Sequence, residues 1–553
     1  MTEKTRRRGR DRSASPSDDA GDVGITIGTP RGRSPVRKHE FEIEDPATYE
    51  PKPMFAAGSS FSLVQKWNDF YANKDFGNIL LLIVLYWLQG IPLGLAHGSI
   101  PFLLKEKLSF AQVGLFSLAG YPYSLKLFWS PFVDSWYDRK FGRRKSWIAP
   151  IQLIVAVMFW WMGSHIDSLV RNPADSIYEI MYLFLAIVFL SATQDIAVDG
   201  WALTLLSKEN LSYASTCQTV GLNCGYFLSF TVFLALNSAE FSNKYIFSSP
   251  REEGFLQLGP YMAFWALMYV VVTLYLIVFK VEETSTSDEA DYGIVDTYKT
   301  IWRICKLPHM RQFIAVLFFA KLGFIPNDST TQLKLIERGL HREDMALAVL
   351  IDFPVQIFFG YYAARWSQGS SKMRPWRIAF VLRLLSSVLS MATVHFFPED
   401  GLTAWYFYII LLTKVAGSMA STVQFVGLSA FITQIADPVI GGTYMTLLNT
   451  LSNFGGTWPV FFIMRAVDYF SSATCVVPGG DMGASYSCAA VEDRKRCLKD
   501  GGVCDVRWDG YYIVSTTCVL FALFLFVTFI RPTVLYLERL PAHVWRVSKE
   551  SHR

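Results

Sequence analysis

The stretch NILLLIVLYWLQGIPLGLAH, residues 78–97, decides the class of fold that this sequence adopts. It is a run of roughly 20 residues without a Lys, Arg, Asp or Glu, long enough for a helix to cross the hydrocarbon core of a bilayer. Similar apolar runs recur along the chain between polar loops. We therefore expect an all-α polytopic membrane protein of about 12 transmembrane helices. The predicted spans lie near 77–103, 109–132, 147–164, 178–206, 213–236, 260–280, 311–336, 345–364, 377–397, 403–434, 440–465 and 510–531.

The composition of the 553 residues also favours a membrane protein. Hydrophobic residues make up 52% of the chain and the mean hydropathy is +0.27, which is more apolar material than a soluble domain of this size hides. The formal net charge of +4 is small, and the basic residues lie mostly in the tail and loops, which argues against a nucleic-acid partner. The expected environment is a lipid bilayer.

The polar segments divide the chain into parts. The first 70 residues are rich in Arg, Ser, Pro, Asp and Gly, a composition typical of disorder. The acidic stretch VEETSTSDEADYG, residues 281–293, separates two groups of six predicted helices, as in transporters built from two halves. We predict a disordered cytosolic tail over 1–70, six-helix halves over 77–280 and 311–531, a cytosolic linker over 281–310 and a cytosolic C-terminal tail over 532–553.

The distribution of Lys and Arg predicts the orientation in the membrane. The loops at 133–146, 281–310 and 365–376 hold the denser basic clusters, which the positive-inside rule assigns to the cytosol. The first 30 residues contain no apolar core of signal-peptide length, so both termini are expected in the cytosol. Four basic residues in loops on the other side run against this orientation: Lys105, Lys107, Arg338 and Arg342.

Four of the eight cysteines gather in one hydrophilic loop, 466–509, on the side opposite the cytosol. Thiols on an oxidising side favour two disulfides, whose pairing the sequence leaves open. A zinc site is the alternative, but the spacing lacks a CxxC pair. The disulfide candidates are Cys475, Cys488, Cys497 and Cys504.

Two charged motifs are candidates for a gate or for coupling. The loop DSWYDRKFGRRKSW, residues 134–147, resembles the Asp-to-Gly-Arg-Arg loop of the major facilitator superfamily, although its spacing is longer by one residue, so that Asp134 takes the acidic role. In QDIAVDGWAL, residues 194–203, two carboxylates four residues apart share one helical face. They are expected to form a gate ion pair with the basic loop rather than to couple protons. The gate or coupling candidates are Asp134, Arg143, Arg144, Gln194, Asp195 and Asp199.

Basic residues inside the predicted spans are candidates for binding substrate. Each costs about 2.5–3.5 kcal/mol at a helix centre, so it needs a partner, a cavity or a function. Together they would attract an anion such as a phosphate. For Lys126 and Arg383 the alternative is that the charged end reaches the membrane interface. The eleventh span, near 440–465, carries a stripe of polar and aromatic residues that could line a cavity, and the alternative there is helix packing through glycines. The substrate-binding candidates are Lys126, Lys321, Arg383, Lys414, Tyr444, Asn449 and Trp458.

Several stretches together resemble the acetyl-coenzyme A transporter family of the major facilitator superfamily. The most specific are QDIAVDGWAL and GGTYMTLLNT, residues 441–450, and the resemblance covers about residues 77–531. It implies a transporter in the endoplasmic reticulum membrane that moves acetyl-CoA from the cytosol into the lumen by alternating access, where it supplies acetylation. No metal, cofactor or catalytic residue is expected, and the sequence lacks GxxxxGK[ST], HExxH and GxSxG.

Other functions stay open from the sequence. A permease for another anionic or sugar-peptide solute, similar to muropeptide permeases, would keep the fold and change the cargo. A membrane acyltransferase that uses acetyl-CoA would need a catalytic group such as His97, Cys217 or Cys224, and a channel would conduct without saturation. The sequence does not distinguish uniport, exchange for CoA and proton coupling, and it leaves pairing with a second copy open.

Overall fold

The computed structural model describes residues 75–545 except 139, 208–209, 211–212, 283–293, 368–370, 372, 399–400, 437–440, 477–485 and 489–490. All of these described residues belong to one compact unit, Asp69–Arg553. The predicted tail over 1–70 lies outside the described residues, as do residues 546–553 of the predicted C-terminal tail.

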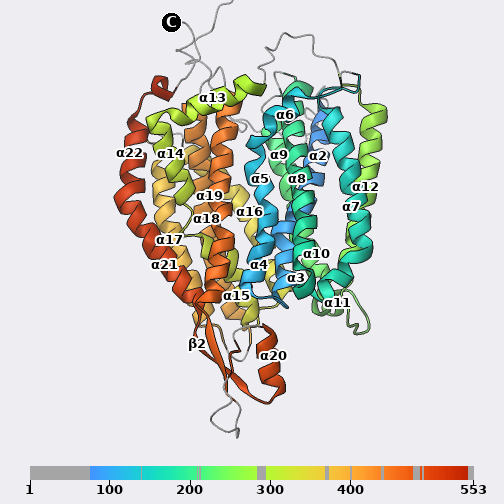
Figure 1. The fold of residues 1–553 in the computed structure, drawn as a ribbon, viewed down its shortest axis with the longest axis vertical. Coiled ribbons are helices and arrows are strands. Elements are labelled where there is room, and N and C mark those ends of the chain that lie inside the picture. The colour runs from blue at the N-terminus through green and yellow to red at the C-terminus, as the bar shows by residue number, and fades with distance from the viewer. Residues whose placement is uncertain are drawn as a thin grey trace, which may run out of the picture. The chain divides into compact units, whose positions relative to one another are not determined.

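The N-terminal half is a bundle of long helices, several of which continue through short π or 3-10 turns (Figure 1). Its elements are α2 Phe76–Gly94, η2 Leu95–Ser99, α3 Ile100–Lys105, α4 Phe110–Ser117, η3 Leu118–Gly120, α5 Tyr121–Leu125, η4 Lys126–Phe128, α6 Ser130–Ser135, α7 Lys145–Arg171, α8 Pro173–Leu205, α9 Tyr213–Phe227, η6 Leu228–Val232, α10 Phe233–Asn237, α11 Ala239–Tyr245 and α12 Leu258–Phe279.

The C-terminal half is built in the same way and lies beside the first half. Its elements are α14 Pro308–Phe319, η7 Asn327–Thr331, α15 Gln332–Glu337, α16 Arg342–Trp366, α17 Arg374–His395, α18 Ala404–Ile435, α19 Gly441–Tyr469, α21 Gly510–Leu525, η8 Phe526–Ile530, α22 Arg531–Arg539 and η9 Ala542–Trp545. Helix α22 continues the last apolar helix, so the first residues of the predicted tail 532–553 are helical.

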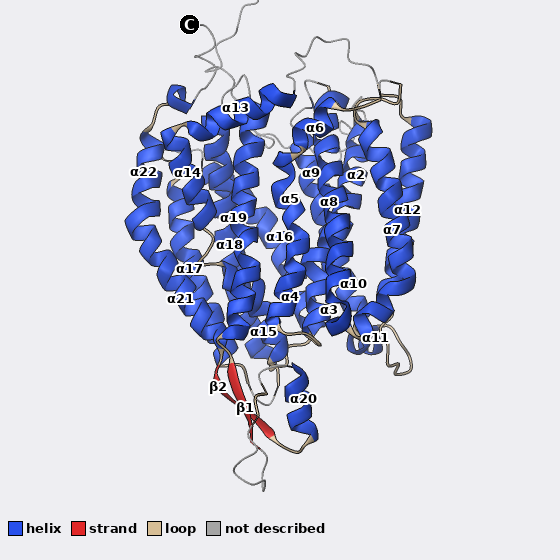
Figure 2. Ribbon diagram, in the orientation of Figure 1, coloured by secondary structure: helices blue, strands red, loops and turns tan. Residues whose placement is uncertain are grey.

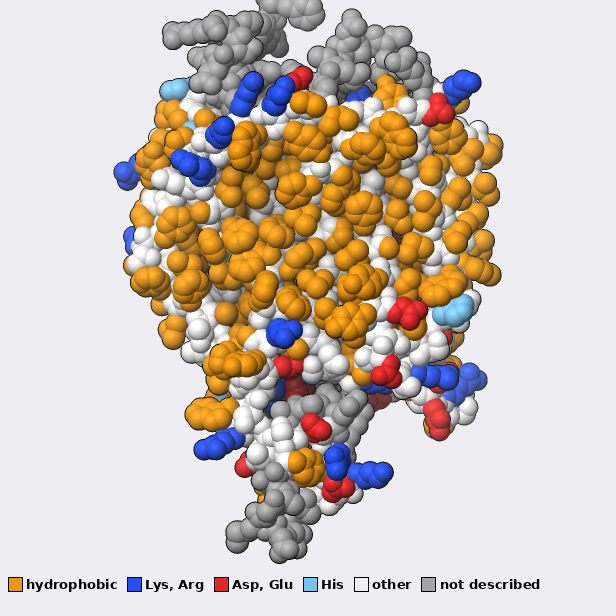
Figure 3. Space-filling view, viewed as in Figure 1, with side chains coloured by type: hydrophobic (Ala, Val, Ile, Leu, Met, Phe, Trp, Pro, Cys, Tyr) orange, Lys and Arg blue, Asp and Glu red, His pale blue; other side chains and the backbone are white. Residues whose placement is uncertain are grey.

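On the face drawn in Figure 3, exposed apolar side chains form a belt across the middle of the bundle, and charged side chains gather toward its two ends. Among the described residues, eight helices are long and apolar enough to cross a membrane. This belt confirms a multi-pass helical membrane protein, because a soluble fold would bury such surface. The eight are Phe76–Lys105, Lys145–Arg171, Pro173–Leu205, Thr216–Asn237, Leu258–Phe279, Arg374–His395, Ala404–Ile435 and Gly510–Arg539.

The remaining four predicted spans are helical but fall outside that set of eight within the described chain. The span 109–132 is interrupted by η3 and η4, and the span 311–336 is interrupted between Phe319 and Asn327. The other two, 345–364 and 440–465, hold charged or polar residues among their apolar ones. The total of about 12 helices therefore stays a prediction.

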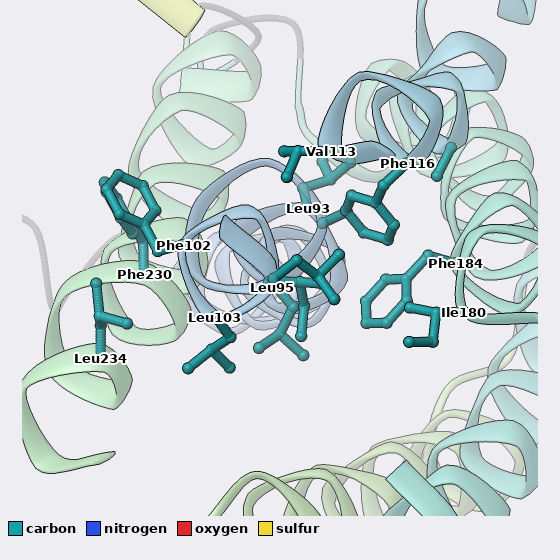
Figure 4. Packing of buried hydrophobic residues seen from close by; sticks show 14 of the residues in the cluster. Leu93, Leu95, Phe102, Leu103, Val113, Phe116, Ile180, Phe184, Phe230 and Leu234 are labelled. Carbon is teal, nitrogen blue, oxygen red and sulfur yellow. The ribbon is translucent and has the colours of Figure 1, made fainter. Parts of the chain in front are cut away.

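In the N-terminal half, aromatic and aliphatic side chains of α2, α3, α4 and α8 pack together with those of η6 and α10 (Figure 4). Phe116 meets Phe184 edge to face at 5.4 Å, and Phe102 lies 5.5 Å from Phe230. Helices α2 and α9 approach more closely than side chains would allow, since a Cβ at Gly225 would lie 2.3 Å from the Trp87 carbonyl oxygen. This close packing holds the helices of the N-terminal half in fixed positions relative to one another.

A small module extends beyond one end of the bundle (Figure 2). Strands β1 Ser472–Val476 and β2 Val503–Trp508 pair antiparallel, with helix α20 Val491–Lys499 between them in sequence. Two disulfides hold it, Cys475–Cys497 and Cys488–Cys504. The predicted disulfides are confirmed and their pairing is resolved, which leaves these four thiols unable to form the alternative zinc site.

The linker between the halves contains an amphipathic helix, α13 Ile294–Lys306, which lies across the opposite end of the bundle (Figure 1). Its Ile304 is buried against the C-terminal half, whereas the Tyr298 hydroxyl donates to the Phe128 carbonyl of the N-terminal half. The linker therefore contacts both halves at the end away from the disulfide module.

Candidate functional site

A cavity of about 500 Å³ lies between the two halves. Its N-terminal wall is largely apolar and includes Phe102, Phe116 and Phe230. Its C-terminal wall carries the charged groups Lys321, Asp328 and Arg383. Such a cavity, mostly apolar with a few converging polar groups, is typical of a ligand site. The cavity is therefore the candidate substrate site.

Lys321 lies at the break between α14 and η7, where the chain forms a turn instead of a helix. Its ammonium donates to the Ser452 carbonyl oxygen at 2.8 Å, and Gly456 leaves room for it, since a Cβ there would lie 3.4 Å from Nζ. An interrupted helix is tolerated at membrane depth where it lines a cavity. The break thus brings a cation to the cavity wall.

Arg383 of α17 reaches the same wall and uses both arms of its guanidinium. One nitrogen lies 2.6 Å from the Asp328 carboxylate and the other 2.8 Å from the Gln424 side-chain oxygen. The guanidinium also stacks over Phe324 at 4.2 Å. Lys321 and Arg383 are therefore brought together, as the sequence predicted for a cationic cavity.

Lys414 is not on the wall of this cavity but lines a second pocket of about 180 Å³ in the C-terminal half. Arg383 and Asp328 line both spaces, so the pocket and the cavity adjoin. The predicted group of four cations is thereby divided between neighbouring sites.

Lys126 differs from the expectation that it lines the substrate site. Its ammonium forms an ion pair with Asp195 and lies 3.5 Å from Asp199. Asp199 also accepts hydrogen bonds from the Tyr86 hydroxyl at 2.8 Å and the Gln218 amide at 2.7 Å. Two carboxylates hold this cation, which corrects its assignment as a free phosphate-binding group.

The gate ion pair expected between Asp195 or Asp199 and the basic loop also needs correction. The basic loop pairs instead with Asp134, whose carboxylate lies 2.5 Å from Arg144 and whose carbonyl accepts from Arg143 at 2.9 Å. The two carboxylates of α8 are already paired with Lys126, and Arg144 of the basic loop pairs with Asp134. Gln194 is buried beside the two carboxylates of α8, and its side-chain nitrogen has no partner among the described residues.

Glu282 is a functional candidate that the sequence did not single out. Its carboxylate accepts from the backbone N–H groups of Arg144 and Lys145 at 3.0 Å, at the beginning of α7. A carboxylate at a helix N-terminus is favoured by the unpaired N–H groups and the helix dipole. Only the tertiary structure shows that this residue of the acidic linker returns to the basic loop.

Three of the residues predicted from the eleventh span do not line the cavity. Tyr444 is fully buried and donates to the Trp545 carbonyl oxygen, Trp458 stacks on Phe318 at 4.8 Å, and Asn449 is exposed elsewhere. This corrects their assignment, because a different face of α19 turns inward. That face presents Ser452, Gly456, Thr457, Val460 and Met464.

Contacts between the halves gather at the end with the disulfide module. The Asp468 carboxylate of α19 accepts from the backbone N–H groups of Phe110 and Ala111, at 3.2 Å and 2.6 Å, and so caps α4. His341 lies 2.8 Å from Glu240 across the same junction. Sequence analysis missed these residues, since a capping carboxylate contributed by a distant helix leaves no local pattern.

A cluster of opposite charges joins the module to this junction. Glu337 lies 3.7 Å from Lys105 of the N-terminal half, 3.3 Å from Lys334 and 3.2 Å from Arg494 of the module. Lys334 also lies 2.8 Å from Asp509. Burial by itself would raise the pKa of Glu337, but the three cations outweigh it and hold the pKa below its usual value. Ion pairs therefore link the two halves and the module at this end of the bundle.

These observations define a class of protein. Apolar helices crossing a bilayer, two halves around a polar cavity and ion pairs that link the halves at one end are the features of a membrane transporter with two halves. The family of acetyl-coenzyme A transporter 1 matches residues 78–291, 282–374 and 369–547. The chain belongs to this family.

Relatives and solved structures agree with this class. The uncharacterized membrane protein YBR220C of Saccharomyces cerevisiae is 42% identical and covers 86% of this chain and 98% of its own. The anhydromuropeptide permease of Escherichia coli is 29% identical over 150 residues, 27% of this chain and 29% of the permease. The nucleoside transporter NupG has a TM-score of 0.54 at 10% identity, over 84% of this chain and 99% of its own, and therefore shares the fold alone. The resemblance stated from the sequence, a transporter of the major facilitator type, is confirmed.

Proposed function

We propose that this protein carries acetyl-CoA from the cytosol into the lumen of the endoplasmic reticulum by alternating access, and so supplies acetylation in the lumen. The observation that carries the proposal is the cavity between the halves, whose C-terminal wall presents Lys321 and Arg383. Acetyl-CoA combines phosphates with an adenine and a long amide-bearing arm. The two cations suit the phosphates, and the aromatic and apolar wall opposite suits the rest.

The chemistry of the two ends supports the orientation that this proposal assumes. The disulfide module marks an oxidising compartment, and the basic loop around Arg143 and Arg144 marks the cytosol. Ion pairs and backbone caps link the two halves at the module end, which the proposal assigns to the luminal side. Release into the lumen then requires the caps on α4 and the Glu337 cluster to separate.

The charged groups at the cytosolic end serve as the opposing gate. Asp134, Arg144 and Glu282 tie α6, α7 and the linker together. The Lys126–Asp195–Asp199 cluster holds α8 against the helix break at η4. We assign the first group to the gate and the second to positioning of the helices, with proton coupling through Asp195 or Asp199 as a property to be tested by imposed pH gradients.

The decisive experiment is uptake of labelled acetyl-CoA by the purified full chain in sealed proteoliposomes, with internal CoA and pH varied separately. Saturable uptake that is stimulated by internal CoA supports exchange, and uptake that follows a pH gradient supports proton coupling. Lys321→Gln should depress uptake while the protein stays folded and monodisperse. Lys306→Gln, an exposed cation on α13 outside the cavity, is the matched control. Vesicles that take up no label would overturn the proposal.

The similarity to the anhydromuropeptide permease supports a second candidate cargo, a sugar-peptide. Competition separates the two, because unlabelled CoA should inhibit an acetyl-CoA transporter and a muropeptide should not. An acyltransferase has less support, because only one of its three candidate catalytic residues, His97, is among the residues that line the cavity. Cys217 and Cys224 are not among them. Product formation in detergent without a sealed compartment would favour the enzyme.

A further inference from the structure

The pocket that contains Lys414 stands apart from the central cavity in its chemistry. It lies between α17 and α18 and the helix turn η7, and its volume of about 180 Å³ is roughly the share of six water molecules in the liquid. Hydroxyl-bearing side chains dominate its walls. They are Thr331, Ser386, Ser390, Thr393, Thr413, Ser418 and Ser421.

The ammonium of Lys414 is available to a ligand. In the part of the chain that the structure describes, no acceptor atom lies within hydrogen-bond or ion-pair distance of it. The carboxylates near enough to influence it are those of Asp352 and Asp328. A cation at membrane depth without a direct partner is costly, which points to a ligand or water that satisfies it.

The two nearby carboxylates accept from other groups, and the one oxygen left without a partner among the described residues, Oδ1 of Asp352, belongs to a residue that does not line the pocket. Asp328 accepts from Arg383 at 2.6 Å. Asp352 accepts from Ser418 at 2.7 Å and from Gln356 at 2.8 Å. Two donors of the pocket therefore remain without a protein acceptor among the described residues, the Lys414 ammonium and the hydroxyl of the buried Ser386. Donors without acceptors favour a compact ligand made of acceptor atoms, and a phosphate monoester is such a ligand.

The pocket also lies where a substrate with several phosphates would need it. Arg383, Asp328, Gln332 and Ser421 line both this pocket and the central cavity, so a ligand can extend from one into the other. Coenzyme A carries a diphosphate and, on its ribose, a separate 3′-phosphate. We propose that Lys321 and Arg383 take the diphosphate in the central cavity, while Lys414 and the serine hydroxyls of the side pocket take the 3′-phosphate. This inference rests on the proposed function and names the subsite that would distinguish coenzyme A from its dephosphorylated form.

The test compares uptake of acetyl-CoA with uptake of acetyl-3′-dephospho-CoA in proteoliposomes of the full chain. The wild-type protein should show a lower KM for acetyl-CoA, on the order of 10- to 100-fold, the range that one hydrogen bond to a charged group contributes. Lys414→Gln should remove this preference by raising the KM for acetyl-CoA and leaving that for the dephospho form within about twofold. Unchanged uptake of the dephospho form also shows that the variant is folded.

Two comparisons make the outcome specific to the side pocket. Lys321→Gln should raise both KM values together, because both substrates carry the diphosphate. Lys414→Arg should retain most of the preference.

The inference is overturned if the wild-type protein does not prefer acetyl-CoA, or if Lys414→Gln raises both KM values equally. These outcomes leave the proposed function standing, because acetyl-CoA is still transported in each. Absence of uptake of either substrate by the wild-type protein would instead remove the proposed function.

Discussion

Both halves of the bundle contain cations among their apolar helices, but they differ in how many carboxylates pair with those cations. In the N-terminal half, Lys126 is held by the two carboxylates Asp195 and Asp199, and Asp199 also receives hydrogen bonds from Tyr86 and Gln218. In the C-terminal half, Lys321, Arg383 and Lys414 lie around the cavity and its side pocket, and Arg383 alone among them has an ion pair in the described chain. The cation of the first cluster is ion-paired within the protein, whereas Lys321 and Lys414 of the second have no carboxylate at ion-pair distance in the described chain.

This difference separates two uses of charge inside a membrane. A cation surrounded by carboxylates contributes to the geometry of its own helices, and removing one partner leaves a buried charge unpaired. Cations that face a cavity are uncompensated until a ligand arrives, so they favour binding more than stability. Substitutions in the two halves should therefore affect different measurements.

The largest expected effect comes from the N-terminal cluster. Asp195→Ala should lower the free energy of unfolding by about 3–5 kcal/mol, because it breaks a buried pair and leaves Lys126 short of a partner. Thermal unfolding of the purified protein in detergent measures it. The double variant Lys126→Met/Asp195→Asn should be less destabilised than the sum of its single variants, and simple additivity would show that the two side chains act independently.

The second effect lies in the C-terminal half and has the opposite character. Lys321→Gln should weaken the apparent affinity for acetyl-CoA by about 1.5–3 kcal/mol, since a charge-assisted contact is lost. The melting temperature should stay equal to that of the wild type or rise, because an uncompensated cation is removed. Uptake kinetics and thermal unfolding of the same preparation test both parts. A variant that unfolds earlier and transports normally would reverse the comparison between the halves.

A smaller effect is expected from Arg383→Lys. The guanidinium reaches Asp328 and Gln424 with separate nitrogens, and a single ammonium cannot reproduce this fork. We expect the apparent affinity to fall by about 1–2 kcal/mol with a small change in stability. The KM for acetyl-CoA measures the loss, and Lys306→Gln on α13 serves as the control for a change of charge outside the cavity. An unchanged KM would place Arg383 outside the substrate contacts.

The smallest effect concerns the cluster at the module end. The pKa of Glu337 is depressed in the folded protein, so its stabilising contribution is present above the unfolded value near 4.3 and is lost as the pH falls through the lower folded value. The contribution should be about 1 kcal/mol because the site is partly exposed. Melting temperatures of the wild type and of Glu337→Gln should converge as the pH falls from 7 toward 3. A constant difference across that range would contradict the assignment.

Much of the architecture could be predicted from the chain alone. Apolar runs of bilayer length, the acidic linker and the distribution of Lys and Arg are local properties, and each is set by the cost of exposing backbone or charge to hydrocarbon. The gathering of four cysteines in one hydrophilic loop predicted disulfides for the same kind of reason, and the family was evident from QDIAVDGWAL and GGTYMTLLNT.

What the sequence determined by itself is that the chain enters a membrane as apolar helices and that certain cations lie deep within it. The tertiary structure decided which of those cations have partners: Lys126 lies beside two carboxylates, Lys321 reaches the cavity at a helix break, and Lys414 enters a separate pocket. It also paired the cysteines and turned a different face of α19 inward. The physical reason is that the hydrophobic pattern specifies where a helix lies relative to lipid, whereas ion pairs and cavities depend on the rotation and register of helices distant in sequence.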